Sequence, residues 1–112
     1  MKRIYLCIPY TGMEALSFKI ANIKAGELMQ AGNLVFSPIS HSHPIALQCK
    51  LPGEHAYWRA WNRSFIEAWA DELYVITEYN RNILPWLEST GVQYEIELAD
   101  QLGKPVVLVG AE

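Results

Sequence analysis

The feature that most constrains the fold is a continuous run of apolar residues near the start of the chain, which reads Ile-Tyr-Leu-Cys-Ile over residues 4–8. A strand exposed on one face alternates apolar and polar residues, whereas a strand buried on both faces does not. Similar short runs recur at residues 34–36, 73–76 and 106–109. They predict a parallel sheet of four to five strands that is covered on both faces.

Stretches with helical periodicity lie between these runs. The predicted helices cover residues 13–30, about 56–70 and about 90–102, and polar loops are expected at 37–44 and 78–88. Alternating strands and helices imply right-handed crossovers, with helices packed on both faces of the sheet. We therefore expect one α/β domain over residues 1–112, a three-layer, flavodoxin-like (Rossmann-like) sandwich.

Composition excludes several functional classes. The chain is 51% hydrophobic, too apolar for a disordered tail, and its net charge of −3 comes without a basic run, which argues against nucleic-acid binding. It contains no apolar stretch of the roughly 18 residues that a membrane span needs, and no signal-peptide cleavage site is apparent. Two cysteines are too few for a disulfide scaffold. We expect a cytoplasmic protein without nucleic-acid or membrane partners.

In open parallel sheets, ligands bind beyond the carboxyl ends of the strands. Three polar, turn-forming segments follow the predicted strands. They are the loop Pro9, Tyr10, Thr11 and Gly12, residues 37–44, and residues 78–91. We expect them to line a binding site.

Glu95 is the most informative single residue. On a helical wheel at about 100° per residue, it falls within the apolar arc of the last predicted helix, whereas Glu97 falls on the polar arc. A carboxylate that faces inward loses hydration and needs a partner or a function. It either meets a buried arginine or hydroxyl and orders the core, or it acts at a site near the sheet edge.

Ser89, Thr90 and Gly91 precede that helix and also allow two interpretations. Thr90 followed by Gln93 fits a capping box, which is a structural helix start. Hydroxyls and free N–H groups at a helix N-terminus also make an anion site, and Gly91 would let a phosphate approach the backbone.

The second predicted helix carries a comparable anomaly. Asn62 falls inside an apolar arc that contains Trp58, Trp61 and Trp69. A buried asparagine needs hydrogen-bond partners, either loop backbone or a ligand. The three tryptophans belong to the core or to a subunit interface, and their number favours a homo-oligomer.

The remaining candidates are histidines and a cysteine. His41, His43 and His55 lack the spacing and partners of a familiar metal site, so we expect no metal and no cofactor. His43, followed by a proline, is expected to present its imidazole towards the sheet edge. Cys7 is interpreted as a small buried hydrophobic residue.

Motifs distributed over nearly the whole chain resemble the nucleoside 2-deoxyribosyltransferase superfamily and, within it, the 2'-deoxynucleoside 5'-phosphate N-hydrolases and small bacterial and phage proteins. The segments that carry the resemblance are Ile4-Tyr5-Leu6 with Pro9-Tyr10, Val35-Phe36-Ser37-Pro38 with His43-Pro44, Asp71-Glu72-Leu73, Ser89-Thr90-Gly91-Val92-Gln93-Tyr94-Glu95, and Gly103-Lys104-Pro105-Val106-Val107.

This resemblance implies roles for individual residues. Glu95 matches the family nucleophile, which attacks the anomeric carbon of the sugar and expels the nucleobase, as in a retaining glycosidase. Tyr5 would orient that nucleophile. Ser89 stands where nucleoside transferases carry an acid, which favours a 5'-phosphorylated substrate. The loop of residues 9–12 would line the base or phosphate pocket.

The chain departs from the family pattern at one position. The family carries an aspartate, used in sugar positioning and proton transfer, where this chain has Asn62 or, in another alignment, Arg63. Asn62 can hold a sugar hydroxyl but cannot transfer a proton near neutral pH. The expected function is thus N-glycosidic cleavage or base transfer on a (deoxy)nucleoside 5'-monophosphate, or nucleotide binding without catalysis, or a structural homo-oligomer.

Overall fold

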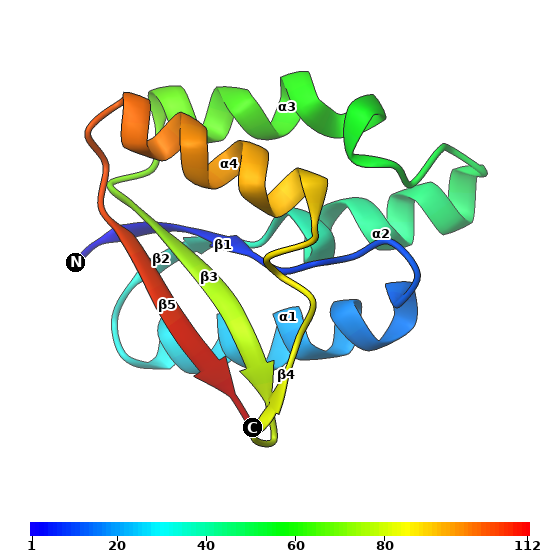
Figure 1. Cartoon of the computed structure of the whole chain (residues 1–112), viewed down its shortest axis with the longest axis horizontal. Coiled ribbons are helices and arrows are strands. Elements are labelled where there is room, and N and C mark those ends of the chain that lie inside the picture. Colours follow the sequence, from blue (N-terminus) through cyan, green and yellow to red (C-terminus); the bar gives the residue numbers. More distant parts are fainter.

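The computed structural model describes residues 1–112 as one three-layer α/β sandwich (Figure 1). The elements in chain order are β1 (Arg3–Cys7), α1 (Glu14–Gln30), β2 (Leu34–Phe36), α2 (Pro38–Cys49), α3 (His55–Ala68), β3 (Glu72–Tyr79), β4 (Asn82–Ile83), α4 (Thr90–Gln101) and β5 (Val106–Ala111). Strands β2, β1, β3 and β5 are parallel neighbours in that order, and the short β4 pairs antiparallel with β3. The predicted fold class is confirmed.

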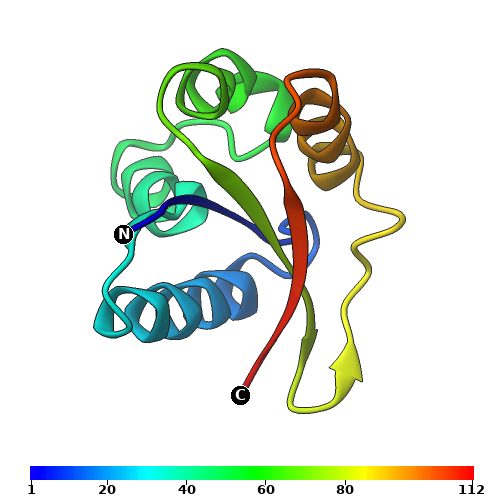
Figure 2. The same cartoon turned by 90° about the vertical axis from the view of Figure 1, so that its left-hand side faces the viewer.

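Two buried clusters lie on opposite faces of the sheet, and β1 contributes alternately to both. Tyr5 and Cys7 face the cluster under α3 and α4, and Leu6 and Ile8 face the cluster over α1. Figure 2 shows these helices on either side of the sheet. Burial of both faces is why the sequence of β1 is continuously apolar.

The prediction of a polar loop over residues 37–44 is wrong, because these residues begin α2. Pro38 occupies the first turn, where its fixed φ suits a helix and its missing N–H removes no bond. Pro44 lies inside the helix, which continues through it to Cys49. Residues 37–44 contain two prolines and three serines, which are atypical of a helix, and for this reason the helix was not predicted. The inward face of α2 places Ser42 and His43 in buried positions.

The predicted loop after β3 is also partly wrong. Strand β3 continues to Tyr79 and turns into β4 through Asn80 and Arg81, whose φ angles are 49° and 67°. Positive φ at both central residues is typical of a tight two-residue hairpin. The chain from Leu84 to Ser89 then returns to the start of α4. None of the four helices combines the length and the hydrophobicity that a membrane span needs.

Candidate functional site

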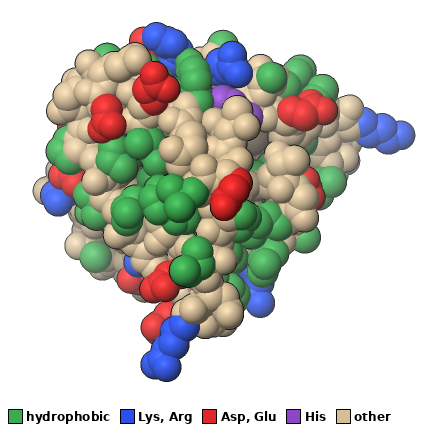
Figure 3. Space-filling model, viewed as in Figure 1, with side chains coloured by type: hydrophobic (Ala, Val, Ile, Leu, Met, Phe, Trp, Pro, Cys, Tyr) green, Lys and Arg blue, Asp and Glu red, His purple; other side chains and the backbone are tan.

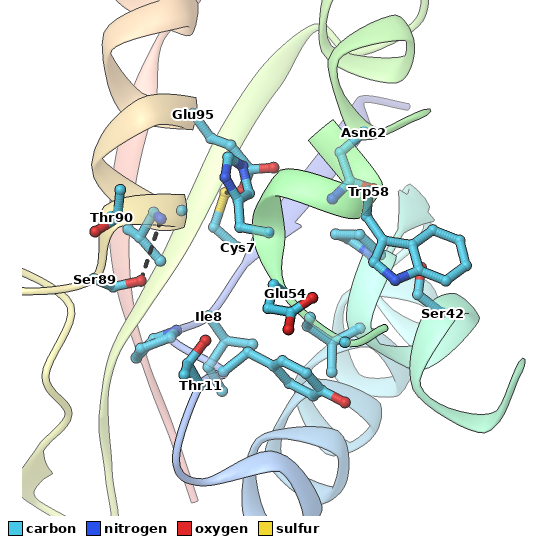
Figure 4. Close-up of a pocket in the computed structure, with 18 of the residues that line it drawn as sticks. Cys7, Ile8, Thr11, Ser42, Glu54, Trp58, Asn62, Ser89, Thr90 and Glu95 are labelled. Carbon is cyan, nitrogen blue, oxygen red and sulfur yellow. Dashed lines mark hydrogen bonds between the residues drawn. The ribbon is translucent and has the colours of Figure 1, made fainter. Parts of the chain in front are cut away.

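A pocket of about 570 Å³ lies at the carboxyl end of β1, between α2, α3 and the start of α4 (Figure 4). Most of the residues that the sequence predicted for the site line this pocket: Pro9, Tyr10, Thr11, His43, Asn62, Ser89, Thr90, Gly91 and Glu95. Two predicted residues do not line it. Gly12 lies outside, in the exposed turn before α1, and Tyr5 is fully buried. The three segments expected to form the site therefore do converge.

Glu95 is buried in this pocket, with 6% of its surface exposed. The Tyr5 hydroxyl donates a hydrogen bond to Glu95 Oε2 at 2.5 Å, and the Cys7 thiol donates one to Oε1 at 3.2 Å. Tyr5 and Cys7 reach the same carboxylate because residues i and i+2 of a strand share one face. Of the two alternatives expected for a structural partner of Glu95, a buried arginine or a hydroxyl, the structure has the hydroxyl, together with a thiol.

Burial raises the pKa of Glu95 to about 7, although hydrogen bonds from Tyr5 and Cys7 act to lower it. All the ion pairs of the protein involve other residues, so no cation neutralises this carboxylate. Burial, followed by the nearby Glu95 charge, also raises the pKa values of Tyr5 and Cys7 well above their usual ranges. Both groups consequently remain protonated donors when Glu95 ionises.

The start of α4 forms another part of the pocket wall. Ser89 is the N-cap, and its Oγ accepts a hydrogen bond from the Val92 N–H at 3.3 Å. The Gln93 side chain instead donates to the Trp86 carbonyl, so the capping box expected for Thr90 and Gln93 is wrong. The N–H groups of Thr90 and Gly91, the first two helical residues, have no partner within the helix and are available to an anion.

Gly91 has a packing role that the sequence did not reveal. A Cβ at Gly91 would lie 3.0 Å from the ring of His55, which is the first residue of α3. A side chain there would push α3 and α4 apart. His55 also lines the pocket, and its pKa is lowered by burial and by the Arg59 charge.

Several buried polar atoms around the pocket make no hydrogen bond. They are Ser42 Oγ, Asn62 Oδ1 and both ring nitrogens of His55. The interpretation of Asn62 as a core residue bonded to loop backbone therefore fails for its oxygen. Unpaired buried polar atoms are costly and rare in folded proteins. Ser42 and Asn62 lie across the pocket from Glu95 (Figure 4), and His55 lies against Gly91 at the start of α4. Unpaired polar atoms around one pocket are what a site for a polar ligand requires.

His43 lies inside α2 and not in the predicted loop, and it lines the pocket. Its Nδ1 shares a 2.5 Å hydrogen bond with the Tyr10 hydroxyl, and its ring packs on Phe18. His41 lies elsewhere and stacks on Trp61. The structure contains no cluster of three or more histidine, cysteine, aspartate or glutamate side chains that could hold a metal ion.

Sequence reasoning missed His55 and Trp58 as pocket residues, did not single out Ser42 within the expected segment 37–44, and misjudged Cys7. Ser42 lay in the segment predicted as a loop, and His55 lay just before the predicted helix. Cys7 is buried, as expected, but it is also a hydrogen-bond donor to the site carboxylate. Its position two residues after Tyr5 on a buried strand was the one signal that could have indicated this.

The arrangement places one buried carboxylate, held by two donors, beside a helix N-terminus that favours anions, and Glu54 and Glu88 also line the pocket. A comparison with curated proteins finds no match. One family model matches residues 2–111 and therefore almost the whole chain. The chain belongs to the family described as Domain of unknown function (DUF1937).

Proposed function

We propose that this protein cleaves the N-glycosidic bond of a (deoxy)nucleoside 5'-monophosphate, or transfers its base, through a glycosyl-enzyme on Glu95. One observation carries the proposal: a buried carboxylate faces the pocket and is held at both oxygens by Tyr5 and Cys7. A nucleophile held in one orientation needs less reorganisation to reach its transition state. The resemblance to the nucleoside 2-deoxyribosyltransferase superfamily supports the same role for Glu95.

The pocket has the size and polarity for a nucleotide. Its volume of about 570 Å³ lies within the range usual for small-molecule sites. The first turn of α4 would hold the phosphate, with the Ser89 hydroxyl still free to donate while its oxygen caps the helix. Asn62 and Ser42, across the pocket, would accept and donate hydrogen bonds to the sugar or the base.

Glu95 Oε1 is the oxygen best placed to attack. Cys7, its hydrogen-bond donor, lines the pocket, whereas Tyr5, the donor to Oε2, is fully buried and does not line it. A thiol is also a weaker donor than a phenol, which leaves Oε1 the more basic oxygen. The phenol would hold the carboxylate in place while Oε1 forms the new bond.

The reaction would run in two displacements. Oε1 bonds to the anomeric carbon as the carbon–nitrogen bond breaks, and the electron pair leaves with the base, which takes up a proton. Water or a second base then displaces Glu95 from the sugar. Asn62 has no proton to give, so the leaving base would be protonated by water or by another pocket group.

The test is base release from a panel of ribo- and deoxyribonucleoside 5'-monophosphates and the matching nucleosides, measured by chromatography. Release from the phosphorylated compounds, abolished in Glu95→Gln, supports the proposal. Glu97→Gln is the matched control, because Glu97 lies exposed on the same helix. Equal turnover in the wild type and Glu95→Gln would reject the role of Glu95.

A second candidate is nucleotide binding without catalysis. It is favoured by Asn62, which replaces the proton-transferring aspartate of the similar family. A thermal shift with a nucleotide, together with no free base after long incubation, would select this function over the first.

A further inference from the structure

Strand β5 forms one edge of the sheet, and the open side of its backbone is unusually suited to pairing. Its only partner is β3. Figure 2 shows β5, in red, along the near side of the molecule with no element in front of it. Natural edge strands are usually protected by lysine, proline, bulges or short length. Between Val106 and Ala111 the sequence Val-Val-Leu-Val-Gly-Ala contains neither lysine nor proline. Pro105, just before the strand, turns its carbonyl to β3 and not to the open edge, and the irregularity in the β3–β5 ladder lies in β3.

The other edge of the sheet is protected. Strand β2 has only three residues, and Pro38 follows it closely at the start of α2. Strand β5 is twice as long and carries Leu108, whose surface is 52% exposed. On the face shown in Figure 3, hydrophobic side chains gather below α4. The two edges therefore differ, and only β5 presents a long apolar edge.

The hydrogen bonds to β3 show which residues of β5 point outward. Pro105 O accepts from the Leu73 N–H at 2.9 Å, and Ala111 O accepts from the Asn80 N–H at 3.0 Å. Backbone groups of successive strand residues point to opposite sides. The odd-numbered residues of β5 thus bind β3, and the N–H and C=O groups of Val106, Leu108 and Gly110 face the open edge.

We propose that β5 pairs antiparallel with β5 of a second copy of this chain, on a two-fold axis at Leu108. In an antiparallel ladder, directly opposed residues that both face the partner exchange two hydrogen bonds. A two-fold axis at Leu108 opposes Leu108 to its own copy and Val106 to Gly110 of the partner subunit. Every outward backbone group of β5 is then paired, and no other register pairs all three residues.

Charge at the ends of β5 fits the same register. It places Lys104 opposite Glu112 of the partner subunit, and the symmetric pair forms at the other end of the ladder. Lys104 Nζ donates to the carbonyls of Ile66 and Glu67, and an ammonium has three donors, so one is left for the carboxylate. Opposite charges at both ends favour antiparallel over parallel association.

The Trp-rich helix is the competing interface. Trp61 and Tyr57 on α3 are 46% and 52% exposed, and the number of tryptophans on this helix itself predicts a homo-oligomer. The backbone N–H and C=O groups of α3 are hydrogen-bonded within the helix, so they cannot fix how two copies of α3 would align. A substitution in β5 should disrupt a dimer formed through β5 but not a dimer formed through α3.

The test is the molar mass in solution, measured by light scattering during size-exclusion chromatography at about 10 to 100 µM. We expect twice the 12.7 kDa of one chain for the wild type. Leu108→Lys opposes two like charges at the axis and should give the monomer. Leu108→Thr introduces an uncharged, β-branched side chain, which suits a strand, and should leave the dimer intact. A monomeric wild type, or a Leu108→Lys dimer, would overturn the proposal, the latter in favour of another interface such as α3.

A second experiment tests the register and does not depend on weakening the dimer. In a Cys49→Ser background, Leu108→Cys should be crosslinked within seconds to minutes by a short bifunctional thiol reagent, because opposed residues lie about 5.5 Å apart. Leu102→Cys is the matched control, since Leu102 is exposed at the end of α4. Equal crosslinking of both variants would refute the axis at Leu108. The pocket contains no residue of β5, so none of these outcomes bears on the proposed chemistry.

Discussion

The Tyr5 hydroxyl and the Glu95 carboxylate, ninety residues apart in the sequence, share a hydrogen bond of 2.5 Å in the interior of the protein. The bond joins the first strand to the last helix, across the sheet face under α3 and α4. A buried carboxylate is costly to ionise, and this donor offsets part of that cost without removing it. The fold therefore keeps an ionisable group whose burial lowers the free energy of unfolding.

Glu95→Gln is expected to stabilise the protein at high pH. The pKa of Glu95 rises from 4.5 in the unfolded chain to about 7 in the folded one, so the folded state holds the proton more tightly. The contribution of Glu95 to wild-type stability is then greatest below pH 4.5 and falls as the pH rises through 7, by about 3 kcal/mol. Glutamine has no charge to desolvate and should escape this loss.

The measurement is urea unfolding of the wild type and Glu95→Gln at pH 4 and pH 8. The difference between their free energies of unfolding should move in favour of the variant by about 2–3 kcal/mol between these values. Glu97→Gln, on the exposed side of α4, should show no such movement. A pH-independent difference for Glu95→Gln would contradict the raised pKa.

Tyr5→Phe should destabilise the protein at high pH, whereas Glu95→Gln should stabilise it. Removal of the phenol leaves a buried carboxylate oxygen without its donor, which costs about 1–3 kcal/mol at pH 8 and raises the pKa of Glu95 further. Base release, which needs the ionised nucleophile, should then rise with pH through a higher midpoint than the wild-type value near 7.

The control for this substitution is Tyr79→Phe, at the far end of β3 and away from the pocket. It should change neither the midpoint of the pH profile nor the stability by more than about 0.5 kcal/mol. NMR titration of the Glu95 carboxyl carbon gives the same midpoint without reference to turnover. An unchanged midpoint in Tyr5→Phe would show that the phenol does not tune Glu95.

Much of the fold could be predicted from the sequence because buried parallel strands have a strong pattern. Four short apolar runs marked the four parallel strands, and the helical wheel placed Glu95 inward as the structure has it. Helix α2 could not be predicted in this way. Its residues 38–49 include two prolines, and its stability comes from packing against α1 and β1 rather than from local propensity.

The candidate site was predictable where topology alone fixes it. The ends of β1 and β2 and the start of α4 must meet at one sheet edge, and there they do. The contributions of Cys7, Ser42 and His55 could not be predicted, because they depend on how particular side chains meet across elements. The capping of α4 by Ser89 rather than Thr90 was a one-residue error of the kind common at helix ends.

Ser89→Ala should weaken nucleotide binding and α4 together. The substitution removes the cap of α4, at a cost of about 1 kcal/mol in stability, and it removes the hydroxyl proposed to hold phosphate. Ser89→Gly separates the two effects, since glycine caps a helix almost as well but has no hydroxyl. We expect both variants to raise KM for a nucleotide by about tenfold, and the nucleoside to be affected less.

The outcome is judged from KM values and thermal unfolding measured on the same samples. A Ser89→Gly variant with wild-type stability and a raised KM for the nucleotide would support phosphate binding. If Ser89→Gly has both the KM and the thermal stability of the wild type, the serine serves only as a cap.

Asn62→Asp should increase base release if protonation of the leaving base limits the rate. Asn62 is 7% exposed and its Oδ1 makes no hydrogen bond. An aspartate at this position would therefore be buried without a hydrogen bond to its outer oxygen. Burial raises the pKa of a carboxyl group, which would keep the new aspartate protonated nearer to neutral pH and able to donate. General acid catalysis contributes about 10²–10⁴-fold in enzymes, and we expect a gain of at least tenfold in kcat.

Asn62→Ala is the matched control, because it removes the amide without supplying an acid, and it should lower kcat/KM. A gain in Asn62→Asp that disappears above the pKa of the new carboxyl, while Glu95 remains ionised, would identify the aspartate as the proton donor. If Asn62→Asp is no faster than the wild type at any pH from 5 to 8, protonation at this position does not limit the reaction. The asparagine would then act only by binding the sugar, and the rate would depend on the attack by Glu95.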